Sequence, residues 1–154
     1  MPTKTSIDRF LNERRLAVVG VSRDPRDFSR EVCRAFTERG YEVHPVNAAG
    51  GEIDGHPFAR RVGDVQPPVE AALLMTPPAA TDDVVRDCVE AGVRRVWMHR
   101  GAGRGAVSEQ AVAFGRDRGI DVIDGACPFM FLPDTGFGHR IHRFFMGLTG
   151  RLPR

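Results

Sequence analysis

The stretch Leu16-Ala-Val-Val-Gly-Val-Ser-Arg-Asp-Pro-Arg-Asp-Phe-Ser29 decides the fold. It opens with a continuous apolar run, which is typical of a strand buried on both faces of a parallel sheet. A polar turn follows, and from Ser29 to about Arg39 apolar residues recur at helical spacing until Gly40 ends the helix. The stretch therefore predicts a strand, a turn and a helix in succession.

The same succession recurs along the chain. Further strands are predicted at 41–46, 71–76, 95–99 and 121–123, and further helices at 7–13, 81–91 and 108–118. Between 47 and 68, glycines and prolines favour an irregular crossover over a helix. Five strands that alternate mostly with helices predict an α/β fold with a doubly wound, mostly parallel sheet. Such sheets bind ligands beyond the carboxyl ends of the strands, where the strand order reverses.

Length and composition fit one globular domain. The chain has 154 residues, of which 42% are hydrophobic. We assign 1–133 to the domain and 134–154 to a helical C-terminal extension of it. The apolar runs are far shorter than the roughly 20 residues that a transmembrane helix needs. With no secretory leader and only three scattered cysteines, we expect a cytoplasmic protein without disulfides.

The charge is mild, at +2. Acidic residues are interleaved with the arginines almost everywhere, so the composition argues against a dedicated nucleic-acid-binding protein.

The first strand–helix turn is a candidate anion site. Unpaired N–H groups and a partial positive charge at a helix N-terminus attract phosphate. Gly20 permits a tight turn, Ser22 and Ser29 offer hydroxyl donors, and Arg23 and Arg26 offer forked, charge-assisted contacts. The turn thus predicts a nucleotide ligand that carries phosphate.

A purely structural interpretation of the turn stays open. In it, Ser29 only caps the helix, and Arg23 and Arg26 only pair with Asp24 and Asp27. The turn also lacks the G-x-G-x-x-G spacing of dinucleotide enzymes. The second strand ends in His44-Pro-Val-Asn47, without the carboxylate that holds the ribose of NAD. These absences disfavour NAD.

Four motifs together resemble the CoA-binding domain family, which includes stand-alone bacterial proteins and the N-terminal domain of the succinyl-CoA synthetase alpha subunit. They are Leu16-Ala-Val-Val-Gly-Val-Ser22, Gly40-Tyr-Glu-Val-His-Pro-Val-Asn47, Gly92-Val-Arg-Arg-Val-Trp-Met98 and Gly119-Ile-Asp-Val-Ile123. The resemblance implies a Rossmann-like fold and coenzyme A or acyl-CoA as ligand.

The same resemblance implies a set of binding residues. The CoA phosphates would lie at Val21, Ser22 and Arg23, and the adenosine end near Pro45, Val46 and Asn47. Four further residues would line the cleft: Thr76, Pro77, His99 and Arg100. This chain departs from the stand-alone members at Arg26-Asp-Phe-Ser29 and at Met75-Thr-Pro-Pro78, where some phosphate contacts are expected to be missing or relocated.

The favoured function is non-catalytic binding of CoA or acyl-CoA by an accessory or sensor protein. The related ligases use a phosphorylated histidine in a further domain, for which the chain to Arg154 leaves no room. One alternative is a small NAD(P)- or nucleotide-dependent Rossmann enzyme, with acid–base groups from His99, Asp124 or His139. Another is an interaction module that has lost its ligand.

Two features near the C-terminus leave alternatives open. Cys127 follows the last strand and would either capture the CoA thiol or simply pack in the core. His139 and His142 stand three apart on a predicted helix and would either join Cys127 at a zinc ion or remain solvated, so no metal site is assigned. The aromatic and basic residues of 134–154 suggest a homodimer interface, a surface for an acidic partner or peripheral attachment to anionic lipid, of which the first is the most ordinary.

Overall fold

The computed structural model describes residues 2–101 and 105–133. The predicted C-terminal helix over 134–154 lies outside this part of the chain, as do residues 102–104. None of the helices within the described ranges is long and apolar enough to span a bilayer.

The five predicted strands form one sheet in the order β2–β1–β5–β6–β7, and every neighbouring pair is parallel. The strands are β1 (Arg15–Val19), β2 (Glu42–Val46), β5 (Ala71–Leu74), β6 (Arg95–Met98) and β7 (Asp121–Asp124). The chain runs from β1 to one side and then crosses to the other. The sheet is therefore doubly wound, as the sequence predicts, with its switch point between β1 and β5.

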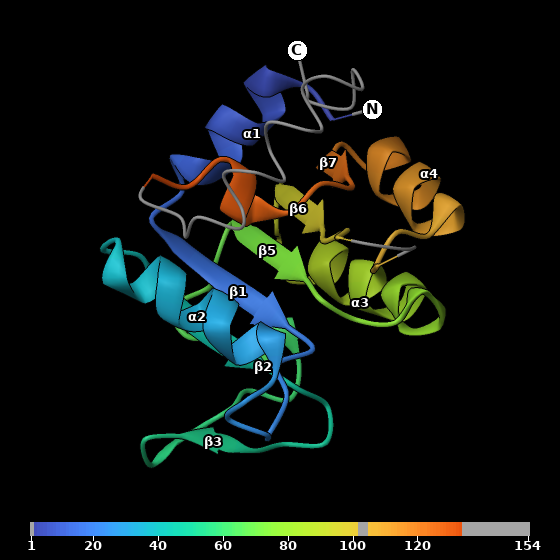
Figure 1. Cartoon of the computed structure of the whole chain (residues 1–154). Helices are drawn as coiled ribbons and strands as arrows, with labels where there is room; N and C mark the ends of the chain where they lie inside the picture. Colours follow the sequence, from blue (N-terminus) through green and yellow to red (C-terminus); the bar gives the residue numbers. More distant parts are fainter. Residues whose placement is uncertain (1, 102–104, 134–154) are drawn as a thin grey trace.

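Four helices flank the sheet (Figure 1): α1 (Lys4–Leu11), α2 (Phe28–Glu38), α3 (Pro78–Glu90) and α4 (Glu109–Asp117). Alternate residues of each strand face opposite layers. Leu16 and Val18 pack with α1 and α2, whereas Ala17 and Val19 pack with α3 and α4. Both faces of the sheet are buried, which explains the continuous apolar runs of the strands.

The first helix begins earlier than predicted. The spacing of apolar residues indicates 7–13, but α1 starts at Lys4 because the Thr3 hydroxyl accepts a hydrogen bond from the Ser6 amide at 3.1 Å. Thr3 is thus the N-cap, and the helix starts three residues before the predicted Ile7.

The crossover from β2 to β5 contains no α-helix, as predicted, but it includes an antiparallel pair that the sequence does not reveal. This pair is β3 (Glu52–Ile53) with β4 (His56–Pro57), and the short 3-10 helix η1 (Val62–Asp64) follows. Between β4 and η1, Ala59 forms backbone hydrogen bonds with the end of β2. The Ala59 amide donates to the Pro45 carbonyl at 3.1 Å, and the Asn47 amide donates to the Ala59 carbonyl at 2.9 Å.

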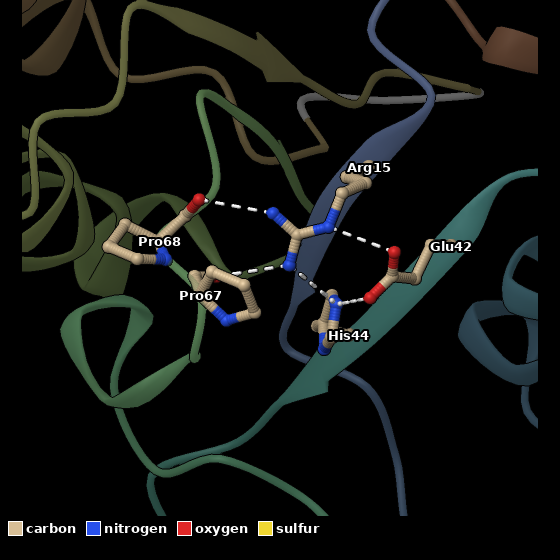
Figure 2. A network of polar contacts seen from close by, with 5 residues as sticks. All are labelled: Arg15, Glu42, His44, Pro67 and Pro68. Atoms are coloured by element: carbon tan, nitrogen blue, oxygen red, sulfur yellow. Dashed lines mark hydrogen bonds and ion pairs between the residues drawn. The ribbon is translucent and has the colours of Figure 1, made fainter.

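Arg15 fastens the end of this crossover to the amino-terminal edge of the sheet (Figure 2). Its guanidinium donates to Glu42 at 2.9 Å and to the carbonyls of Pro67 and Pro68 at 3.0 and 3.2 Å. Hydrogen bonds from Arg15, and then from His44, lower the pKa of Glu42. This network lies at the opposite end of the strands from the switch point, so it braces the sheet without occupying a ligand site.

Candidate functional site

A cleft of about 580 Å³ lies at the carboxyl ends of β1, β2 and β5. This is the switch point, where the chain leaves β1 toward one side and β5 toward the other. Five residues named from the sequence line it: Gly20, Val46, Asn47, Thr76 and Pro77. The start of α3 and the segment around Arg60 and Arg61 complete the walls. Fold topology therefore gathers five of the thirteen candidate residues from three separate strand ends.

Gly20 directs the chain out of β1 into the first turn. Its φ is +90°, a conformation that favours glycine. Its amide donates to the Val46 carbonyl at 2.8 Å, and the amide of buried Val21 reaches the same carbonyl at 3.3 Å. The two amides tie the turn to the end of β2.

Ser29 faces the inside of the turn. Its side chain is 3% exposed, and its hydroxyl accepts from the Ser22 amide at 2.9 Å and donates to Asp27 at 2.5 Å. Asp27, and not Ser29, is the N-cap of α2, accepting from the Ser29 amide at 2.8 Å. Within the described turn, Ser29 therefore positions Ser22, and the cap carboxylate already occupies the helix N-terminus.

Arg26 adopts the pairing that the structural interpretation of the turn expects. Its Nε lies 3.2 Å from Asp24, and hydrogen bonds from Arg26 lower the pKa of that carboxyl. The Arg26 side chain is 90% exposed and does not line the cleft. Arg23 points elsewhere: a Cβ placed on Gly51 would come 2.8 Å from its Cγ, so Arg23 lies against the crossover.

Asn47 joins the end of β2 to the first turn. Its side-chain amide donates to the Val21 carbonyl at 2.8 Å, and its carbonyl oxygen accepts from Ala49 at 2.8 Å. Asn47 occupies the strand end where NAD-binding domains place a carboxylate. Here the side-chain amide of Asn47 instead holds the end of β2 against the first turn.

Thr76 lines the bottom of the cleft and is 8% exposed. Its hydroxyl is 2.8 Å from that of Thr81, which donates onward to the Ala106 carbonyl at 2.8 Å. These buried hydroxyls hold the loop after β5 against the loop before α4.

His99 and Arg100 lie apart from the cleft, beyond the end of β6. The centroid of the His99 ring lies 5.6 Å from that of Phe28, and the centroids of Phe28 and Phe129 lie 5.4 Å apart. Burial lowers the pKa of His99, and its Nε2 is buried without a hydrogen-bond partner among the described residues. Arg100 is exposed, and its amide donates to Ala126 at 3.1 Å. The candidate set thus divides among the cleft, the first turn and an aromatic cluster at the end of β6.

Sequence reasoning did not identify four of these neighbours as site residues: Phe28, Arg60, Arg61 and Phe129. Phe28 was visible as the aromatic side chain just before the predicted helix. The others reach the site through irregular chain, where no periodic signal exists.

Cys127 is buried in the core, where it is 4% exposed, so packing is the alternative that the structure supports. Burial raises the pKa of its thiol, and the charge of Glu31 raises it further. Cys33 and Cys88 are also core residues, as predicted, and burial raises the pKa of each to about 12. His139 and His142 lie outside the described residues, among which no group of potential ligands could hold a metal.

Comparison with known proteins agrees with this architecture. The chain is 31% identical over 105 residues to the alpha subunit of ADP-forming acetate–CoA ligase II of Pyrococcus furiosus, covering 68% of this chain but 23% of that subunit. It is 28% identical to YneT of Bacillus subtilis, over 82% of this chain and 91% of that protein. It thus spans about a quarter of the ligase subunit and nearly all of YneT.

A solved structure shows the same fold. A hypothetical protein from Pyrococcus horikoshii OT3 superposes with a TM-score of 0.74 at 24% identity, over 82% of this chain and 87% of that one. The family model described as the CoA binding domain matches residues 14–133, which include every described candidate residue. The chain therefore belongs to the CoA binding domain family.

Proposed function

We propose that the chain binds coenzyme A or an acyl-CoA across the carboxyl ends of β1, β2, β5 and β6. One observation carries the proposal: the cleft at the switch point is lined by Gly20, Val46, Asn47, Thr76 and Pro77, and the chain belongs to a family named for CoA binding. The family supplies the ligand class, and the cleft supplies a place for it.

The adenosine end fits the cleft beside Pro45, Val46 and Asn47, where the backbone is fixed by hydrogen bonds on both sides. The pyrophosphate would lie at the turn of Ser22 and Arg23. Because the Ser22 amide is already bonded to Ser29, the Arg23 guanidinium supplies the main attraction for the phosphates.

The pantetheine arm would then extend over the end of β6 toward His99. Beside it Phe28, which is 36% exposed and packs on buried Phe129, offers an apolar surface for the arm or for a short acyl group. The cleft, the first turn and the aromatic cluster would thus hold the adenosine, the pyrophosphate and the pantetheine arm in turn.

Binding without chemistry is the second part of the proposal. Asp124, one possible acid–base group of a rival Rossmann enzyme, already forms an ion pair with Arg116 at 3.6 Å. The ligase subunit has roughly four times the length that this chain matches. We infer that this chain corresponds to the CoA-binding part and binds CoA without catalysing a reaction on it.

Calorimetric and thermal-shift titrations with CoA, acetyl-CoA, NAD and ATP test the proposal. A ligand at a hundred times its Kd adds about 2.7 kcal/mol to the free energy of unfolding, so CoA species should raise the Tm while NAD does not. A response to NAD without one to CoA would overturn the proposal in favour of the enzyme. No response to any of the four would favour the interaction module.

Arg23→Gln locates the phosphates. Loss of the guanidinium should weaken CoA binding about tenfold. Arg94→Gln is the matched control, because exposed Arg94 precedes β6 at the opposite end of the sheet. Equal affinities for the two variants would mean that the phosphates bind elsewhere.

A further proposal concerns where the protein resides. The three thiols are unpaired and buried, which suits a reducing compartment such as the cytoplasm.

The last proposal concerns its partners. The aromatic and basic sequence of 134–154 would form a homodimer or partner contact. Sedimentation of the full chain tests the homodimer, and a monomer mass at all concentrations would exclude it.

A further inference from the structure

Backbone hydrogen bonds of the preceding residue hold Arg60 at the end of β2. The preceding residue, Ala59, bridges to Val46 in parallel register. Its amide donates to Pro45 and its carbonyl accepts from Asn47. These bonds fix the start of Arg60 beside the three residues proposed for the adenosine end.

The other charges of the cleft are already paired. Arg61 lies 2.5 Å from Asp87, and Asp83 lies 3.2 Å from Arg86 outside the cleft wall. Arg60 is the remaining charged residue of the lining. Its one hydrogen bond to the described residues is a long contact of 3.4 Å with the Ala48 carbonyl. Among the residues that the structure describes, the cleft lining therefore presents one uncompensated positive charge to a ligand.

Arg60 and Arg23 flank the same tight turn. A Cβ on Gly50 would come 3.3 Å from the Arg60 guanidinium, and one on Gly51 would come 2.8 Å from Arg23 Cγ. Both glycines have positive φ, at +80° and +137°. The chain thus carries two cations on neighbouring sides of one turn, which suits a ligand with two separate phosphate groups on one ribose.

We propose that Arg60 is a specificity-determining residue that binds the 3′-phosphate of the CoA ribose, while Arg23 faces the pyrophosphate. The inference rests on the proposed function and adds which adenosine ligands the cleft selects. A guanidinium presents a fork of N–H donors that matches phosphate oxygens. The protein should therefore discriminate CoA from dephospho-CoA, which lacks only the 3′-phosphate.

Isothermal titration of the full chain with CoA and with dephospho-CoA measures this selection. The wild type should bind CoA about tenfold more tightly. Arg60→Gln should lower the affinity for CoA to that for dephospho-CoA and leave the affinity for dephospho-CoA unchanged. Arg23→Gln should weaken both ligands by the same factor, because both contain the pyrophosphate.

Arg94→Gln, with the same change of charge at the opposite edge of the sheet, should keep the wild-type ratio. Arg60 is exposed, so its variant should fold, and circular dichroism melting checks this. If CoA binds and Arg60→Gln keeps the wild-type ratio, the role of Arg60 is overturned while the proposed function stands. If the folded wild type binds neither ligand, the proposed function fails and this inference fails with it.

Discussion

The backbone of Gly20 lies directly against that of Met75, across the switch point between β1 and β5. A Cβ on Gly20 would come 3.0 Å from both the carbonyl carbon and the carbonyl oxygen of Met75. Neither backbone can retreat, because the Met75 amide donates to Val19 at 2.8 Å and Gly20 is bonded to Val46. The position thus requires glycine for its φ and for its space.

Gly20→Ala should therefore destabilise the fold by more than conformational strain alone. Strain at positive φ costs about 1–2 kcal/mol, and the clash with Met75 adds about 1–3 kcal/mol. Gly92→Ala is the matched control, since Gly92 has φ +80° with nothing within 4 Å of its Cβ position. Urea denaturation measures both, and equal losses would show that the contact with Met75 is unimportant.

Ser29→Ala tests whether the buried Ser29 hydroxyl stabilises the first turn. The variant leaves the Ser22 amide and the Asp27 carboxylate without their common partner, which should cost about 1–3 kcal/mol of unfolding free energy. Ser22→Ala removes only a bond to the exposed Asp24 amide and should cost less. Chemical denaturation gives the two values, and the reverse ranking would contradict this account of the turn.

The sheet and its helices could be predicted because each element carries its own signal. The buried strands are continuously apolar, and Gly40, Gly92 and Gly119 all have positive φ just after a helix. Apart from the missed β3–β4 pair, the largest errors lie at helix starts. α3 begins at Pro78 and not at 81, because proline is tolerated in the first helical turn although it interrupts the apolar period.

The site could be predicted only where it consists of strand ends. Gly20, Asn47 and Thr76 lie within two residues of the ends of β1, β2 and β5, so topology brings them together. Arg60 enters the cleft through the bridge between Ala59 and Val46, a contact between distant segments that leaves no local pattern. Phe129 lies in the 3-10 helix η2 (Pro128–Met130), too short to show a period.

All three thiols should be protected in the native protein. Cys33, Cys88 and Cys127 are each at most 5% exposed, and burial raises the pKa of each. An aromatic disulfide reagent at pH 8 should react slowly with the folded chain and rapidly with three thiols in urea. Oxidised CoA should give no adduct by intact mass. Rapid native labelling that Cys127→Ala abolishes would restore the idea of thiol capture.

His99 should make stability depend on pH below neutrality. Burial lowers its pKa in the folded state below the ordinary value of 6.5, so the unfolded chain takes up this proton first as the pH falls. The free energy of unfolding should thus be undiminished above about pH 6.5 and should decrease from pH 6.5 toward pH 5, by about 1.4 kcal/mol for each unit of pKa difference.

His99→Phe should remove this part of the pH dependence. A phenyl ring retains the contact with Phe28 and eliminates a buried Nε2 that has no partner within the described chain, so its stability at pH 7 should equal or exceed that of the wild type. His56→Gln, in the exposed β3–β4 hairpin, should keep the wild-type slope. Urea denaturation at pH 5, 6, 7 and 8 compares the three proteins. If His99→Phe keeps the wild-type slope, other groups govern the acid sensitivity, and the imidazole beside Phe28 is solvated in the folded protein.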